Sequence, residues 1–96
     1  MTTKGLFIVS NEKIDKMWDE LKTQRDELRV QMHLAKAELK DEWEEIEGKY
    51  QHAQTKLDEV KKQTGEAAID ARKTMNVVIE EIGEAYGRVK HRLNKP

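Results

Sequence analysis

Apolar residues recur at every third or fourth position along most of this chain, which is the spacing of one face of an α-helix. The pattern begins at Ile14, ends at Leu93 and is broken near Gly65. A glycine can take the left-handed backbone conformation that ends a helix, and a new apolar stripe begins just after this one. We therefore predict two helices, the first over about 11–63 and the second over about 66–94.

The stripe of the first predicted helix follows the 3.5-residue repeat of a coiled coil and then changes register. Arg25 interrupts it once, and the four-residue step from Leu39 to Trp43 marks the change of register. Because no Gly, Pro or Asn lies between Lys36 and Glu47, we expect the helix to continue through this point as a stutter, which locally unwinds a coiled coil. The stripe consists of Ile14, Trp18, Leu21, Leu28, Met32, Ala35, Leu39, Trp43, Ile46, Tyr50, Ala53, Leu57 and Val60.

The second predicted helix has a broader apolar face, because Val77 and Ile79 extend its stripe sideways. A helix with such a face usually packs against two neighbours rather than one. Acidic residues stand near its expected start and basic residues near its expected end, which suits the helix dipole. Its stripe consists of Ala68, Ala71, Met75, Val78, Ile82, Tyr86, Val89 and Leu93.

The lengths of the two predicted helices indicate an uncovered surface. At 1.5 Å per residue they would span ~80 Å and ~43 Å, so an antiparallel hairpin would leave the first half of the first helix unpaired. An exposed apolar seam of this size is a liability in a monomer. We therefore predict an all-α, antiparallel coiled-coil hairpin that forms a homodimer, a four-helix assembly, with a partner protein as the alternative. The predicted partner-binding residues of this seam are Trp18, Leu21, Leu28 and Met32.

Residues 1–10 are predicted to form an extended arm ahead of the first helix, since β-branched and aromatic residues favour extended backbone. Ser10 at its end suits a helix N-cap, because its hydroxyl can accept a hydrogen bond from a free amide of the first turn. The apolar run of the arm has two interpretations: it wraps over the protein's own helices, or it docks on a sheet edge or groove of another protein. This run consists of Leu6, Phe7, Ile8 and Val9.

Composition narrows the class of protein. The 96 residues suffice for one domain, and 39% charged with 5% aromatic residues is typical of long helices and coiled coils. A formal net charge of -1 provides no field that would attract nucleic acid. The chain has no cysteine, no apolar run that would span a bilayer and no segment typical of a signal peptide, so we expect a cytoplasmic protein.

Candidate chemistry is scarce. The histidines at 33, 52 and 91 lack the Glu-x-x-His spacing of metal sites in helical bundles, and we interpret them as solvated. The acidic cluster at 41–47 would spread its carboxylates around a helix instead of converging them on a cation, and we interpret it as a solvated face. The aromatic residues Trp18, Trp43, Tyr50 and Tyr86 fall on the stripes, so burial is favoured over base stacking. We expect no enzyme activity, no metal and no cofactor.

A motif-like stretch runs from Ala53 to Val60 (Ala-Gln-Thr-Lys-Leu-Asp-Glu-Val) and is followed by Thr64-Gly65-Glu66-Ala67. It resembles the pattern A-Q-x-K-L-x-E-L, S-G-E-A-W of a family of small bacterial coiled-coil proteins labelled stress-response or uncharacterised. The upstream segment 35–43 is similar to its K-A-x-A-K-x-E-Y segment. Ala68 stands where the family has tryptophan, and residues 5–9 are not part of the pattern. The resemblance implies a helical hairpin and no specific chemistry.

Three hypotheses for the function follow. The first is a non-enzymatic scaffold or adaptor that acts by protein binding, with the association with stress that the resemblance implies. The second is an accessory subunit that docks on a larger complex through the arm. The third is reversible binding to a lipid surface, which we do not favour because Glu80, Glu81 and Glu84 lie among the basic residues of the second helix.

Overall fold

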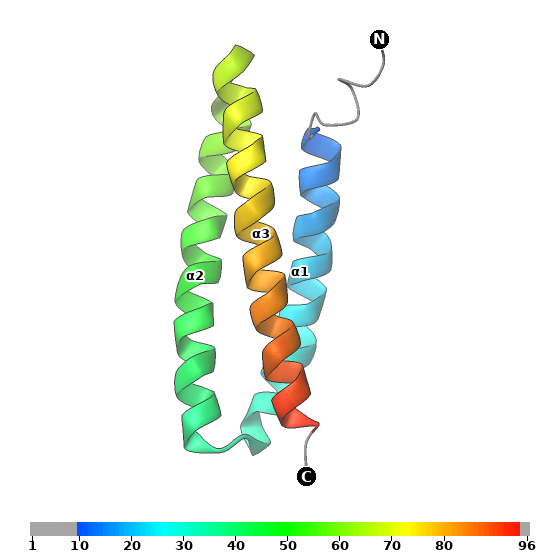
Figure 1. Cartoon of the computed structure of the whole chain (residues 1–96), viewed down its shortest axis with the longest axis vertical. Coiled ribbons are helices and arrows are strands. Elements are labelled where there is room, and N and C mark those ends of the chain that lie inside the picture. The colour runs from blue at the N-terminus through cyan, green and yellow to red at the C-terminus, as the bar shows by residue number, and fades with distance from the viewer. Residues whose placement is uncertain (1–9, 95–96) are drawn as a thin grey trace.

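The structure is a computed structural model that describes residues 10–94, and within this range it consists of three α-helices joined by short connections. They are α1 (Asn11–Gln31), α2 (Ala37–Lys62) and α3 (Gly65–Leu93), with a single 3₁₀ turn, η2 (Met32–Leu34), between α1 and α2. The helices form an elongated bundle of 51 × 25 × 16 Å in which α2 runs opposite to α1 and α3 (Figure 1).

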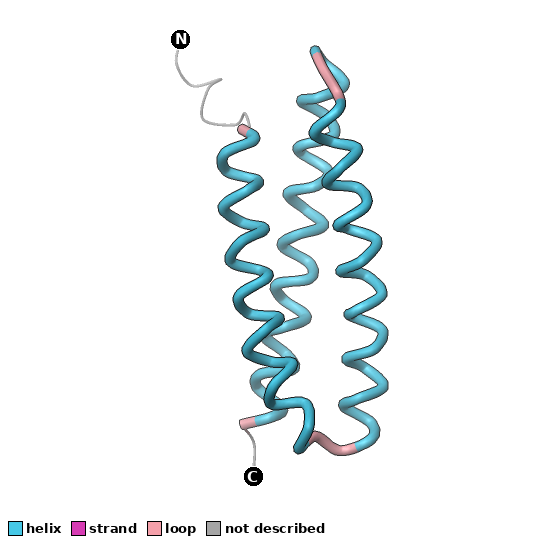
Figure 2. The backbone as a smooth tube through the Cα atoms, turned by 180° about the vertical axis from the view of Figure 1, so that it is seen from behind, coloured by secondary structure: helices cyan, strands magenta, loops and turns pink. Residues whose placement is uncertain are grey.

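The prediction of one continuous helix over 11–63 is wrong. The α-helix α1 ends at Gln31, and after the 3₁₀ turn the backbone of Ala35 and Lys36 is extended, with ψ angles of 154° and 159°. This turn reverses the chain at the lower end of the bundle, where Figure 2 shows it as a loop. No residue in it prevents a helix. The reversal is favoured because it lets α1 bury its apolar stripe against the same chain, and such tertiary packing overrides helix propensity.

The predicted break near Gly65 is confirmed, and so is the helical hairpin that follows from it. Lys62 is the last residue of α2, and Gly65 begins α3 with a φ of 66°, a left-handed value that favours glycine. The predicted cap of the first helix is confirmed as well. The amide of Lys13 donates a hydrogen bond of 3.1 Å to the Oγ atom of Ser10.

The central element of the bundle is α3, which packs closely against both α1 and α2. This confirms the prediction that its broad apolar face meets two neighbours. Ile79 contributes to that face and is buried, whereas Val77 lies outside it and is 51% exposed. One core cluster therefore runs along the bundle, with members from all three helices. Its largest fully buried side chains are Ile14, Met75, Tyr86 and Val89.

The prediction that the first half of the stripe lies uncovered is also wrong. Trp18, Leu21, Leu28 and Met32 are only 3% to 7% exposed, because α1 folds back onto the hairpin of its own chain. A second copy is therefore not needed to bury these residues, and the argument for a dimeric four-helix assembly from helix lengths no longer holds. The arm residues Leu6, Phe7, Ile8 and Val9 lie outside the residues that the structure describes.

Candidate functional site

Arg25, which interrupts the apolar stripe of α1, forms an ion pair across the bundle. Its Nε and Nη2 atoms donate hydrogen bonds of 2.7 and 2.8 Å to the two carboxylate oxygens of Glu47 on α2. The guanidinium carbon also lies 4.4 Å from the ring centroid of Tyr50. About a fifth of each charged side chain is exposed, 20% for Arg25 and 21% for Glu47. The pair thus fixes the register of α1 against α2 with a two-point contact that few other residue types provide.

The electrostatics of this pair follow from its geometry. The hydrogen bonds that Arg25 donates to Glu47 raise the pKa of Arg25 above its usual range, so the guanidinium keeps its charge. Burial raises the pKa of Tyr50, and the neighbouring positive charge of Arg25 opposes part of that rise. Neither group has the pKa near neutrality that a general acid or base would need.

Two aromatic stacks lie above and below the ion pair in the core. The rings of Trp18 and Tyr50 have centroids 4.7 Å apart and an interplanar angle of 16°, which joins α1 to α2. The rings of Trp43 and Tyr86 have centroids 5.6 Å apart and an angle of 30°, which joins α2 to α3. All four rings are buried, which confirms the prediction, so none of them is an exposed platform for a nucleic-acid base.

The hydroxyl of Tyr86 is buried and has no hydrogen-bond partner among residues 10–94. Burial raises the pKa of Tyr86 above its ordinary value, and the nearby carboxylate of Glu47 raises it further. The ring is useful for packing, but the hydroxyl adds a desolvation cost. Nothing around it resembles an activated nucleophile.

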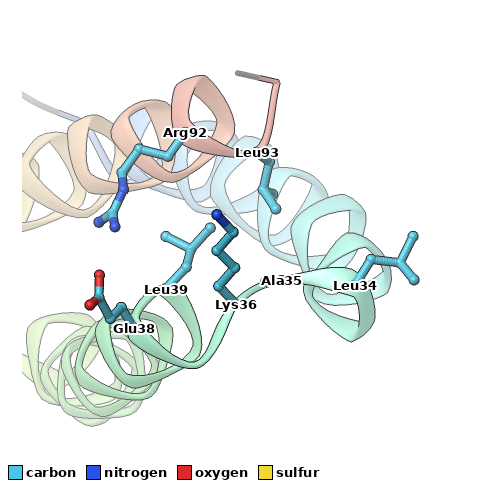
Figure 3. Close-up of a pocket in the computed structure, with 7 residues that line it drawn as sticks. All are labelled: Leu34, Ala35, Lys36, Glu38, Leu39, Arg92 and Leu93. Atoms are coloured by element: carbon cyan, nitrogen blue, oxygen red, sulfur yellow. The ribbon is translucent and has the colours of Figure 1, made fainter. Parts of the chain in front are cut away.

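The other notable feature is an open pocket of about 460 Å³ at the lower end of the bundle, between the 32–36 turn and the last turn of α3. Leu39 and Leu93 form apolar walls, and the side chain of Lys36 extends between them (Figure 3). Arg92 lines the pocket from α3 and also forms an ion pair with Glu42. The pocket therefore combines apolar walls with two cations and the carboxylate of Glu38.

Leu34 lies at the rim of this pocket and is 93% exposed, with its side chain pointing away from the other lining residues (Figure 3). Val30, four residues earlier near the end of α1, is 70% exposed. We call Val30, Leu34 and the pocket the end patch. The sequence analysis did not predict the end patch. The available signal was that Val30 and Leu34 are apolar but stand outside the apolar stripe. The four partner-binding residues predicted on the seam of the first helix lie in the core instead.

The acidic cluster is partly used for contacts between helices. Glu42 pairs with Arg92 of α3 and Glu47 with Arg25 of α1, so two of its carboxylates hold the bundle together. The remaining members, Asp41, Glu44 and Glu45, are exposed, as are the three histidines. Within residues 10–94 no three potential metal-ligating side chains come together.

No family model, no curated protein and no solved structure matches this chain. The resemblance to small bacterial coiled-coil proteins stays a prediction. The proposed function therefore rests on the geometry of this chain alone.

Proposed function

We propose that this chain is a non-enzymatic adaptor or scaffold, a three-helix bundle that acts by binding another protein through the end patch. The proposal rests on the exposure of Leu34. This side chain is 93% exposed beside an open pocket, whereas the apolar stripes of all three helices are buried. A single exposed leucine needs no explanation, but an apolar pair next to a concave surface is typical of an interaction site.

The chemistry of the end patch suggests what it binds. Leu39 and Leu93 would contact an apolar side chain of the partner, and Lys36 would meet a carboxylate beside it. Arg92 is engaged with Glu42, which leaves Lys36 as the cation that is more available for a new contact. A partner segment with an apolar anchor next to an acidic residue fits this arrangement.

The other hypotheses rank lower for physical reasons. Docking through the arm remains an alternative that concerns residues outside the described range. Lipid-surface binding would require the bundle to open, because its apolar faces point inward. Within residues 10–94, no helix combines the length and the apolar character that crossing a bilayer requires. A role in stress, a bacterial source and a cytoplasmic location rest on the resemblance and on composition.

The test is the native mass of the protein purified gently from its own source, measured by light scattering after size exclusion. We expect stoichiometric co-elution with a second protein, and we expect Leu34→Gln to abolish it. Val77→Gln is the matched control, since Val77 is also an exposed apolar residue but lies on α3 away from the end patch.

Both substitutions replace an exposed apolar side chain, so neither should change the fold or its stability by more than about 0.5 kcal/mol. Co-elution that survives in Leu34→Gln, or that is lost equally in Val77→Gln, would contradict the proposed site. A native mass equal to that of the single chain would contradict the proposed function itself.

A further inference from the structure

The turn that separates α1 from α2 is built from residues that also favour a continuous helix. Residues 32–36 are Met, His, Leu, Ala and Lys, with no Gly or Pro among them. If this segment became helical, Leu28, Met32, Ala35 and Leu39 would lie along one face, at steps of four, three and four residues. The apolar stripe of α1 would then continue into that of α2 without interruption.

Local hydrogen bonds do little to hold the turn in its bent form. The start of α2 at Lys36 has no side-chain cap, whereas Ser10 caps the start of α1. Ala35 donates one 3₁₀-type bond to the carbonyl of Met32. In a continuous helix the first amides of α2 would instead bond to carbonyls of the turn. The bent form is therefore held mainly by the packing of α1 on the hairpin.

The contacts that hold α1 do not depend on its covalent link to the same hairpin. They consist of its buried stripe and of two ion pairs to α2, Arg25–Glu47 and Asp15–Lys61. A second copy of this chain presents the same hairpin surface, with the same partners in the same places. It is therefore complementary to α1 by construction.

We propose that α1 exchanges between two copies of this chain, so that residues 32–36 straighten and α1 of each copy packs on the α2–α3 hairpin of the other. Asn11–Lys62 then forms one helix of about 78 Å, against a longest dimension of 51 Å for the closed bundle. This inference goes beyond the proposed function, since it concerns the purified chain alone and needs no other protein.

Charge sets the conditions under which exchange occurs. In the straight helix, Arg29, Lys36 and Lys40 share the face that carries Arg25, and the same face of the second copy runs antiparallel beside it. Like charges therefore meet where the two long helices cross. We expect the closed monomer to dominate at low ionic strength and the exchanged dimer to gain as salt screens this repulsion.

The decisive variant is Ala37→Pro. Ala37 is the first residue of α2, where proline fits a helix, and the extended backbone of Lys36 before it is the conformation that proline requires. In a straight helix the same proline would remove a hydrogen bond and clash with the preceding turn. The matched control is Asn11→Pro, at the first position of α1, where both forms tolerate proline.

The readout is dimer fraction by light scattering as a function of chain concentration, at about 0.1 M and about 1 M salt. We expect the wild-type chain and Asn11→Pro to dimerise to the same extent, more strongly at high salt, and Ala37→Pro to dimerise at least about tenfold more weakly. Lys36→Pro, where the backbone is also compatible with proline, serves as a second hinge variant.

A covalent assay identifies which hairpin α1 occupies. The chain has no cysteine, so the pair Asp15→Cys and Lys61→Cys can be joined by a short bismaleimide. The closed bundle gives a link within one chain, and the exchanged dimer gives a link between two chains. Exclusively intrachain links at concentrations where dimers form, a chain that stays monomeric in all conditions, or hinge variants that dimerise like the wild type would each overturn the proposal.

Discussion

The side chain of Tyr86 has one part that stabilises the core and one part that destabilises it. Its ring stacks on Trp43 and is buried among residues of all three helices. Its hydroxyl has no hydrogen-bond partner among residues 10–94, so it was desolvated on folding without compensation. The ring contributes packing, and the oxygen atom does not.

We therefore expect Tyr86→Phe to leave the free energy of unfolding unchanged or to raise it by about 1 kcal/mol. The measurement is urea denaturation followed by circular dichroism. Tyr50→Phe is the control, because the ring of Tyr50 lies against the guanidinium of Arg25 and should gain nothing from losing its hydroxyl. A loss of more than about 1 kcal/mol in Tyr86→Phe would indicate a hydrogen bond that the structure does not contain.

The same variant should change the response to alkaline pH. Because burial raises the pKa of Tyr86 in the folded state, the unfolded chain releases this proton first, near the ordinary tyrosine value of about 10. The contribution of neutral Tyr86 to the free energy of unfolding is therefore fully present below a pH of about 10. It falls as the pH rises further, because the unfolded chain loses this proton while the folded state keeps the tyrosine neutral. Unfolding curves at increasing alkaline pH should show a smaller fall in Tyr86→Phe than in the wild type.

At this scale the sequence predicted burial well and polar partners poorly. The stripe positions of Trp18, Trp43 and Tyr50 are buried as expected. In the sequence, Arg25 could be recognised only as an interruption of the apolar stripe. Its partner Glu47 belongs to another helix, and the two side chains meet only because the chain reverses between α1 and α2. Val30 and Leu34 were overlooked because the periodicity of a stripe says nothing of apolar residues outside it.

At the scale of the elements, two glycines in the hairpin have opposite roles. Gly48 lies within α2, and a Cβ atom there would meet nothing within 4 Å. Gly65 begins α3 with a φ of 66°, which a residue with a Cβ atom adopts only with strain.

We expect Gly48→Ala to raise the free energy of unfolding by about 0.5–1 kcal/mol, since alanine is the better helix former. Gly65→Ala should lower it by about 1–2 kcal/mol, because the left-handed backbone is penalised. Each alanine adds one methyl group, so the two variants are controls for one another in thermal or urea unfolding. Equal effects of the same sign would show that the α2–α3 connection differs from the one described.

The pairing of α1 with α2 depends on side chains that reach across the bundle, and Arg25–Glu47 is the more enclosed of the two ion pairs between these helices. Arg25→Met or Glu47→Leu alone should cost about 1–2 kcal/mol, a discounted figure because both groups are partly exposed. The double variant should recover part of this loss, since neither charge remains unpaired. A double-mutant cycle by urea denaturation measures the coupling.

The Asp15–Lys61 pair provides the matched comparison for that cycle. Its side chains are about half exposed, at 52% and 50%, so its coupling should not exceed about 0.5 kcal/mol. Equal coupling for the two pairs would mean that Arg25 and Glu47 are more accessible to water than their geometry indicates.

The position of the helix break shows what a periodic pattern cannot resolve. The change of register after Leu39 was real, but a stutter within one helix and a reversal between two helices give the same spacing of apolar residues. The break at Gly65 had a residue with special backbone freedom, whereas the turn at Ala35 and Lys36 has none. Only the packing of α1 on α3 distinguishes the two arrangements.

On the scale of the whole molecule, the all-α class and the antiparallel hairpin were accessible from sequence, and the closed bundle was not. The inference of an uncovered seam followed from the assumed length of the first helix, so one missed turn changed the expected assembly. With that turn in place, the apolar stripes of all three helices face a common interior. The surface that remains for recognition is smaller, and the end patch is the part of it where an exposed leucine borders an open pocket.

The two tryptophans give this bundle an internal optical readout for two of its helix contacts. Trp18 stacks on Tyr50 and so reports on the α1–α2 contact, while Trp43 stacks on Tyr86 and reports on the α2–α3 contact. A chain that keeps only one indole therefore has an emission spectrum sensitive to one of these contacts. Time-resolved fluorescence of the two single-tryptophan proteins would show whether α1 leaves the hairpin before the hairpin itself comes apart.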